Sequence, residues 1–168
     1  GGLLDVVLDP DYASQPWVYW SYSEPGTGPE TRLAGTAVAR GRLQGDRMEQ
    51  VEVIYRQRPK VEGSGHFGSR LVFARDKTLF ITLGERQKDQ PSKPSRDNAQ
   101  NVASALGKVV RIQRDGSIPP GNPRFAGSGA LPELWSIGHR NPQGATLHPV
   151  TGELWITEHG PQGGDEVN

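Results

Sequence analysis

The amino-acid sequence predicts an all-β protein built from repeated four-stranded units, the arrangement of blades in a β-propeller. A similar pattern of strands recurs about every 65 to 75 residues along the chain. Glycine and proline are frequent, with 22 and 14 residues among 168, and only 33% of the residues are hydrophobic. This composition favours many turns and thin cores over a helical bundle.

Each repeat begins with a predicted β-hairpin. An apolar strand is followed by a polar turn carrying proline or aspartate, and then by a strand rich in aromatic and β-branched residues. The three hairpins cover residues 5–11 with 17–22, 70–76 with 78–82, and 145–149 with 153–157.

Two further strands follow each of the first two hairpins. They comprise residues 36–43 and 50–55 in the first repeat, and 108–113 and 134–137 in the second. Alternation such as Val51-Glu52-Val53 is typical of a strand with one wet face. The chain has room for about two to three blades, whereas closed propellers usually have four to eight. We therefore expect residues 1–168 to be one partial propeller domain, truncated at both ends.

No segment of the sequence clearly indicates a helix. Residues 97–106 could form one or two helical turns, with Asp97 as N-cap and Gly107 as the stop signal. Residues 88–95 and 118–129 have the composition of long loops, and long loops over a rigid sheet often cover a site.

Charge and composition exclude several classes of function. The 19 basic and 19 acidic residues balance, so nothing electrostatic indicates nucleic acid as a partner. No apolar run reaches the roughly 20 residues of a membrane-spanning helix, so we expect no membrane insertion. The absence of cysteine excludes disulfides, thiolate catalysis and cysteine-ligated metals.

Three glycine-rich segments carry dense polar side chains between the predicted strands. They are residues 65–70, 138–144 and 159–166. Loops of this kind usually face a ligand rather than a core. We expect the three to assemble one polar site.

These segments also carry a family resemblance. Residues 66–73, 106–112, 115–119, 138–144 and 158–166 resemble, in order, the motifs of soluble aldose sugar dehydrogenases that depend on pyrroloquinoline quinone (PQQ), the glucose/sorbosone dehydrogenase family. The resemblance extends from Gly2 to Asn168. It implies a six-bladed β-propeller that oxidises the C1 hydroxyl of aldose sugars to lactones, with PQQ as hydride acceptor and Ca²⁺ beside it. It also implies a periplasmic or secreted protein.

The resemblance assigns the catalytic base to His66. Imidazoles titrate near neutral pH, and Gly65 and Gly68 would leave the ring reachable. By the residues alone, His66 would more often be structural. Glucose-specific members of the family carry aspartate before this histidine, where this chain has Gly65, so the resemblance favours the broader aldose-oxidising branch. As the catalytic base, His66 would also contact the sugar substrate.

Four residues match cofactor-contacting positions of the family. A guanidinium suits quinone oxygens, and the resemblance has Arg140 also stabilise charge on the quinone, as a catalytic residue. The other three residues are Asn141, Gln143 and His159. The alternative for Arg140 is a surface salt bridge, and the alternative for the other three is an ordinary polar turn.

The resemblance also implies metal and sugar contacts. Main-chain carbonyls of Gly160 and Pro161 would hold calcium, and Glu166 could ligate a second, structural calcium. Asp165 and Gln90 match positions near the sugar. A plain Gly-Pro turn and solvated acids are the alternatives for residues 160–166.

The residues that clamp PQQ in the family lie beyond Asn168, so we expect this chain alone to bind PQQ poorly and to be inactive. Two other functions stay open: a non-catalytic propeller binding module, and a calcium-dependent propeller hydrolase. The sequence leaves open the electron acceptor and whether the protein forms a homodimer.

Overall fold

The computed structural model describes residues 2–89 and 97–168, and it is an all-β structure of three antiparallel sheets. The first blade contains β1 (Leu3–Leu8), β2 (Trp17–Pro25), β3 (Ala34–Gln44) and β4 (Arg47–Arg56). The second contains β5 (Gly68–Phe73), β6 (Leu79–Leu83), β7 (Lys108–Ile112) and β8 (Leu134–Ile137). The third contains β9 (Pro142–Leu147), β10 (Leu154–Glu158) and β11 (Glu166–Val167). Within the described residues there are also two 3-10 turns, η1 (Gly28–Glu30) and η3 (Pro161–Gly163).

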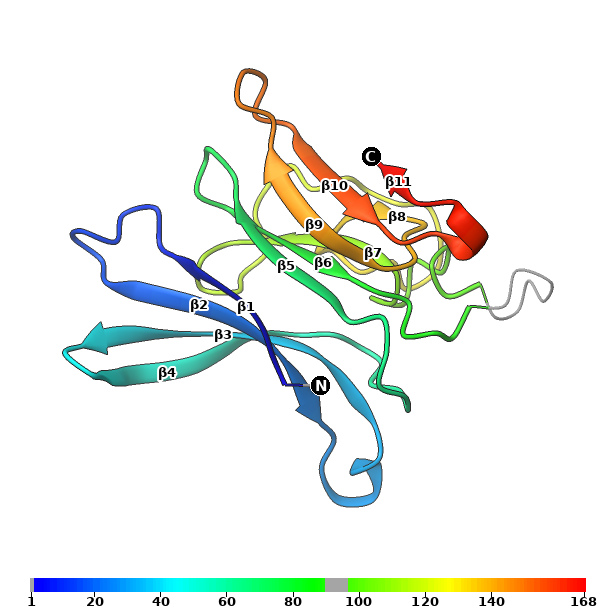
Figure 1. Cartoon of the computed structure of the whole chain (residues 1–168), viewed down its shortest axis with the longest axis horizontal. Helices are drawn as coiled ribbons and strands as arrows, with labels where there is room; N and C mark the ends of the chain where they lie inside the picture. The colour runs from blue at the N-terminus through cyan, green and yellow to red at the C-terminus, as the bar shows by residue number, and fades with distance from the viewer. Residues whose placement is uncertain (1, 90–96) are drawn as a thin grey trace.

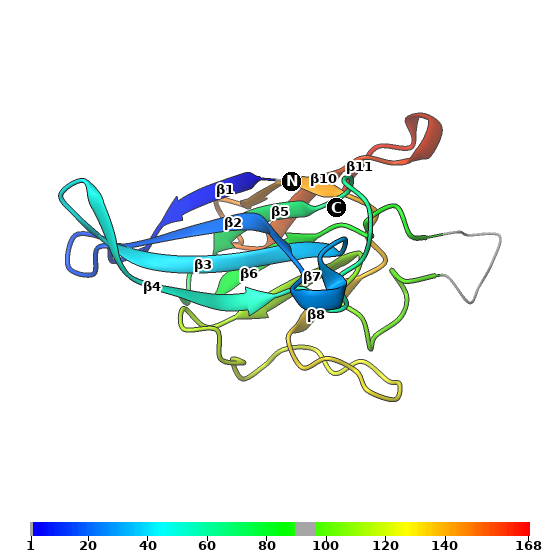
Figure 2. The same ribbon diagram turned by 90° about the horizontal axis from the view of Figure 1, so that it is seen from below.

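Each strand pairs with the next strand in the chain, as a propeller blade requires. Figure 2 shows the first blade fanned in order from β1 to β4. The four-stranded repeat and the hairpin that opens each copy are therefore confirmed. The chain forms part of a β-propeller, with two four-stranded blades and a third blade of three strands.

The blades stack through two apolar cores. The larger core joins Tyr19 and Val38 of the first blade to Leu79, Ile81 and other residues of the second. The smaller core joins Phe80 to Ile156 of the third blade. Strand β6 is buried along its whole length because both of its faces are covered, which explains its nearly continuous apolar sequence.

The first strands of the three blades, β1, β5 and β9, lie side by side (Figure 1), and polar contacts join them. Asp5 accepts hydrogen bonds from the Leu71 backbone N–H at 2.8 Å and from the Arg70 guanidinium at 3.0 Å. Arg70 also donates to the Gln143 carbonyl at 3.1 Å. Through Arg70, all three blades are fixed relative to one another at their inner edge.

Two local predictions were wrong or incomplete. Residues 97–106 form turns and no helix, and the Asp89 carboxylate accepts the N–H groups of Asn98 and Ala99 at 2.8 and 3.0 Å. Strand β11 was not predicted. No helix within the described parts of the chain is long and apolar enough to cross a membrane.

Truncating a core residue of β6 should destabilise the fold strongly. Ile81 is fully buried, so Ile81→Ala should lower the free energy of unfolding by about 2–5 kcal/mol through lost burial and an unfilled cavity. Val150→Ala is the control, since Val150 is 78% exposed, and it should change stability by less than about 0.5 kcal/mol. Urea unfolding measures both, and equal losses would contradict the assigned core.

Candidate active site

One cavity of about 500 Å³ lies where the loops at one end of the blades meet. Its wall includes His66, which precedes β5, and Glu85, which follows β6. Arg140, which precedes β9, and Pro161, which follows β10, also line it. The structure thus brings residues from all three predicted polar segments together in one cavity.

His66 contacts a buried carboxylate. Its Nδ1 lies within hydrogen-bonding contact of Glu85 Oε1, and Glu85 is only 3% exposed. Glu85 Oε2 accepts the backbone N–H groups of Lys88 at 2.5 Å and Asp89 at 3.0 Å. Because each partner of Glu85 can be a donor, the carboxylate orients the ring with Nδ1 protonated. The lone pair of Nε2 is then the basic position of His66.

The backbone around His66 is tightly folded. His66 adopts φ 51°, in the left-handed region that non-glycine residues seldom occupy. A Cβ on Gly84 would collide with the His66 carbonyl, so glycine is needed where the end of β6 passes this loop. The sequence Leu83-Gly84-Glu85 therefore places the carboxylate directly beside the imidazole.

Arg140 is held by a second histidine–glutamate pair. Glu158 accepts the Arg140 backbone N–H at 2.7 Å and contacts His139 Nδ1 at 3.0 Å. Burial alone would raise the pKa of Glu158, but hydrogen bonds from His139 and from backbone N–H groups outweigh it and hold the pKa below its usual value. The Arg140 guanidinium donates through Nη1 to the His159 carbonyl at 2.9 Å. Its Nε and Nη2 atoms make no hydrogen bond with described residues.

The other predicted cofactor residues lie beside the cavity wall. Asn141 is buried, and its Oδ1 accepts the Gly68 N–H at 3.2 Å. His159 Nε2 lies 2.9 Å from Gln143 Oε1, and His159 is exposed. Asp165 is also exposed and accepts the Gly160 N–H at 2.9 Å. Gln90, predicted to lie near the sugar, falls outside the described residues.

The predicted metal ligands do not form a calcium site by themselves. The Gly160 carbonyl already accepts Arg140 Nη1 at 3.4 Å, and the Pro161 carbonyl accepts the Gly164 N–H at 3.0 Å. Glu166 Oε2 instead accepts a hydrogen bond from Asn168 Nδ2 at 3.1 Å. Calcium takes six to eight oxygen ligands. The described residues hold no cluster of three or more histidine, aspartate or glutamate side chains suited to a metal.

Gly65 leaves space that a neighbouring side chain fills. A Cβ on Gly65 would lie 2.7 Å from the Gln87 carboxamide, which also lines the cavity. Gln87 is exposed and makes no hydrogen bond within the described residues. The carboxamide therefore occupies the position that a side chain at residue 65 would need.

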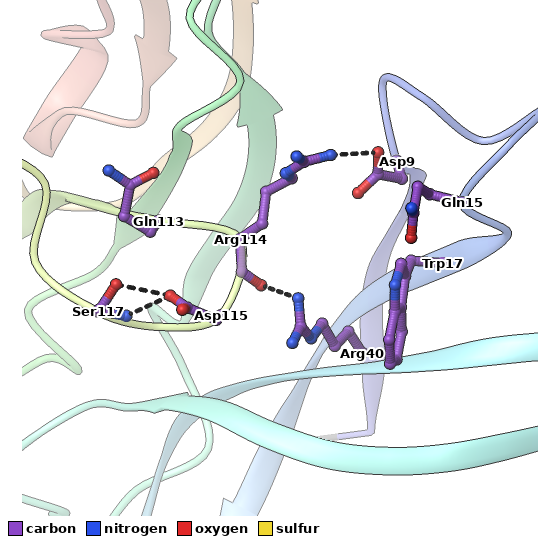
Figure 3. A pocket seen from close by; sticks show the side chains of 8 residues that line it. All are labelled: Asp9, Gln15, Trp17, Arg40, Gln113, Arg114, Asp115 and Ser117. Atoms are coloured by element: carbon purple, nitrogen blue, oxygen red, sulfur yellow. Dashed lines mark hydrogen bonds and ion pairs between the residues drawn. The ribbon is translucent and has the colours of Figure 1, made fainter.

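A second hollow of about 510 Å³ lies at the other end of the blades, between the first and second blades (Figure 3). Arg114 donates to Asp9 at 3.0 Å, and Arg40 donates to the Arg114 carbonyl at 2.8 Å (Figure 3). Arg40 also stacks 4.4 Å from the Trp17 ring centroid. Since these charged groups satisfy one another across the two blades, this hollow is an interblade contact rather than a ligand site.

Comparisons with known proteins agree with the fold. The family described as "Glucose / Sorbosone dehydrogenase" matches residues 1–168. The chain belongs to this family. It is 46% identical over 170 residues to the aldose sugar dehydrogenase YliI of Escherichia coli K12, covering 100% of this chain and 43% of the relative. It is 30% identical over 183 residues to quinoprotein glucose dehydrogenase B of Acinetobacter calcoaceticus, covering 99% of this chain and 37% of that protein.

Two solved structures of the family superimpose on the whole chain. The apo form of the soluble aldose sugar dehydrogenase from Escherichia coli has a TM-score of 0.88 at 45% identity and is covered over 46% of its length. The PQQ-bound aldose sugar dehydrogenase from Streptomyces coelicolor has a TM-score of 0.80 at 29% identity and is covered over 45%. The chain therefore spans less than half the length of these relatives.

Sequence reasoning about this family member missed three residues of the site. The charged run at residues 85–89 gives no sign of burial in the sequence, yet Glu85 and Arg86 are buried. His139 and Glu158 were assigned no role, yet they hold the backbone of Arg140. Their position in the sequence could have indicated the two glutamates. Each stands at or just after the end of an apolar strand, at the end of a hairpin that lies beside the cavity.

Glu158 should make stability depend on acid pH. Its folded pKa lies below the unfolded value of 4.5, so its charge stabilises the fold above about pH 4.5 and this stabilisation is lost as pH falls through the folded pKa. Glu158→Gln should therefore be less stable than wild type at pH 7, with the gap narrowing below about pH 4.5. Thermal unfolding between pH 3 and 7 measures this gap.

The control for Glu158 is Glu153→Gln, because Glu153 lies exposed in the turn between β9 and β10. Its stability should run parallel to that of wild type across the same pH range. A gap for Glu158→Gln that stays constant down to pH 3 would show that the Glu158 charge does not stabilise the loop.

Proposed function

We propose that the whole protein carrying this chain oxidises the C1 hydroxyl of aldose sugars to lactones, with PQQ as hydride acceptor. The observation that carries the proposal is the His66–Glu85 pair on the wall of a cavity that also contains Arg140. Support comes from the family, from an aldose sugar dehydrogenase at 46% identity and from a PQQ-bound relative. The same resemblance supports a periplasmic or secreted location.

His66 supplies the base in this proposal. Glu85 fixes the imidazole with Nδ1 protonated, and Nε2 takes the proton of the anomeric hydroxyl as the C1–H electrons leave as hydride. The sugar loses one proton and one hydride and becomes a lactone. Glu85 also stabilises the imidazolium that forms, because its charge lies directly beside the ring.

PQQ, when bound, supplies a quinone that accepts the hydride. The residues described fit one side of such a group. The two unengaged nitrogens of Arg140 offer charged donors to quinone oxygens, and Asn141 fixes the neighbouring backbone from a buried position. Gln143 and His159 lie next to each other beside this wall and are the further cofactor contacts of the proposal.

Calcium belongs to the proposal only as an ion to be tested. Gly160 and Pro161 offer two carbonyl oxygens, of which one already faces a guanidinium, so other ligands would have to complete a site. No step is assigned to the ion. Chelation followed by re-addition of Ca²⁺ to the whole protein decides whether it is required.

Replacing His66 should abolish turnover while leaving the cavity intact. In the whole protein, His66→Ala should lower kcat by about 100-fold or more, because general-base catalysis contributes that much, with PQQ binding retained. The assay is dye reduction with a panel of aldoses, with PQQ added or withheld. His148→Ala is the matched control, since His148 lies in the remote turn between β9 and β10.

The same assay separates the alternative functions. A wild-type protein that turns over no aldose but binds glycans would be the non-catalytic module, and hydrolysis of lactones without PQQ would identify the hydrolase. Unchanged turnover by His66→Ala would rule out the base assigned here.

Gly65 should influence which sugars are accepted. Gly65→Asp would displace the Gln87 carboxamide and place a carboxylate in the cavity, where it can accept hydrogen bonds from sugar hydroxyls. We expect the ratio of kcat/KM for glucose to that for other aldoses to rise by about 3-fold or more. Gly65→Ala displaces Gln87 without adding the acceptor, and an equal change in that variant would contradict the assigned role of the carboxylate.

A further inference from the structure

Arg86 is a buried cation directly behind the cavity wall. Its side chain is 0% exposed, and it forms no ion pair with a described carboxylate. Its guanidinium instead donates to three backbone carbonyls, those of Gly63 at 2.5 Å, Ala34 at 2.6 Å and Gly65 at 2.9 Å. A buried charge needs such partners, so its place in the fold is set by the loop it binds.

The loop bound by Arg86 is the one that carries His66. We call residues 63–67 the His66 loop. Besides the Gly63 and Gly65 carbonyls, the Arg86 guanidinium lies 3.6 Å from the ring centroid of Phe67. The Arg86 backbone N–H also lies 3.3 Å from the His66 carbonyl. Arg86 therefore contacts four of the five residues of this loop.

The His66 loop needs to be held. His66 and Arg86 both adopt left-handed backbone conformations, with φ of 51° and 62°. Such conformations persist in non-glycine residues only where the surroundings enforce them. The contacts of Arg86 provide that enforcement, and its contact with Ala34 ties the loop to the first blade.

We propose that Arg86 is a positioning residue for the sugar oxidation proposed above: it clamps the His66 loop so that the imidazole meets Glu85 on one side and faces the cavity on the other. The inference rests on the proposed function, but the clamp itself can be measured without turnover. Arg86 does not line the cavity, so it acts through His66 and not on the sugar.

Arginine suits this position better than lysine. Burial lowers the pKa of Arg86 to about 10, so the guanidinium remains charged at neutral pH. Lys108, which is also fully buried and bound to two carbonyls, has its pKa lowered by burial to about 8. A planar guanidinium also reaches three carbonyls and stacks on a ring at once, which an ammonium cannot do.

The test compares Arg86→Met and Arg86→Lys in the whole protein. The first readout is hydrogen–deuterium exchange of the backbone N–H groups of residues 61–68. We expect Arg86→Met to speed exchange there at least 10-fold and to lower kcat at least 10-fold, with KM changed less than 3-fold. Arg86→Lys should recover part of both losses, because an ammonium can still reach some of the carbonyls.

Arg111→Met is the matched control. Arg111 also stacks on an aromatic ring, 5.1 Å from the Trp135 centroid, and donates to Thr78 and Asp76 at 3.0 Å each. It lies in the second blade away from the cavity lining. This variant should lose comparable thermal stability but leave exchange in residues 61–68 and kcat within 2-fold of wild type.

The two proposals fail in different ways. Wild-type exchange in Arg86→Met, or an equal loss of kcat in Arg111→Met, would overturn the clamp. Absence of aldose oxidation by the wild type would overturn the proposed function, while the exchange measurement would still decide whether Arg86 holds the loop. If Arg86→Met does not fold, Arg86→Lys carries the test: exchange in residues 61–68 should exceed that of wild type, and wild-type exchange there would overturn the clamp.

Discussion

The site depends on the contact between the His66 imidazole and the buried Glu85 carboxylate, and this contact follows from hairpin register. Gly68 pairs with Leu83 across β5 and β6, so the residues just before β5 and just after β6 must meet. The third blade repeats this logic, because Pro142 pairs with Glu158 and brings Glu158 to His139. Both histidines precede their glutamates by 19 residues. Both imidazoles line the cavity, but His139 is buried and its partner Glu158 fixes the backbone of Arg140.

Blade stacking turns these separate hairpins into one site. Each hairpin could place its own histidine and glutamate, but only the contacts between inner strands bring two hairpin ends to the same cavity. Thr82 donates to the Pro142 carbonyl at 2.8 Å, and Asn141 accepts the Gly68 N–H at 3.2 Å. These bonds fix the loop before β9 against the hairpin that carries His66. A shift between the second and third blades would therefore separate Arg140 from His66 without breaking either hairpin.

The strands were predictable because their signals are local, whereas the site partners were not. Alternation and turn residues identified the strands of the first two blades and the hairpin of the third. Glu85 and Arg86 are buried by a neighbouring blade and by the His66 loop. The sequence around residue 85 carries no signal of these distant segments. Strand β11 is two residues long, too short for any periodicity to show. Residues 97–106 form turns instead of the helical turns that Asp97 and Gly107 suggested, and the Asp89 carboxylate that binds the Asn98 and Ala99 N–H groups stands outside that local pattern. The resemblance supplied roles for His66 and Arg140, but geometry alone showed which carboxylates orient them.

A chain without cysteine must hold its long loops by other means, and here buried side-chain donors do so. Gln57 donates to the Gly84 and Ala105 carbonyls at 3.3 Å each, and Lys108 donates to the Asn98 and Leu106 carbonyls. Loops near a cavity expose carbonyls that no strand partner satisfies, and an unsatisfied buried carbonyl is destabilising. A long donor side chain anchored in a neighbouring strand or loop removes that penalty and fixes the loop at the same time. The polar residues buried behind the cavity therefore hold its loops in place, because they satisfy the backbone carbonyls that no strand partner reaches.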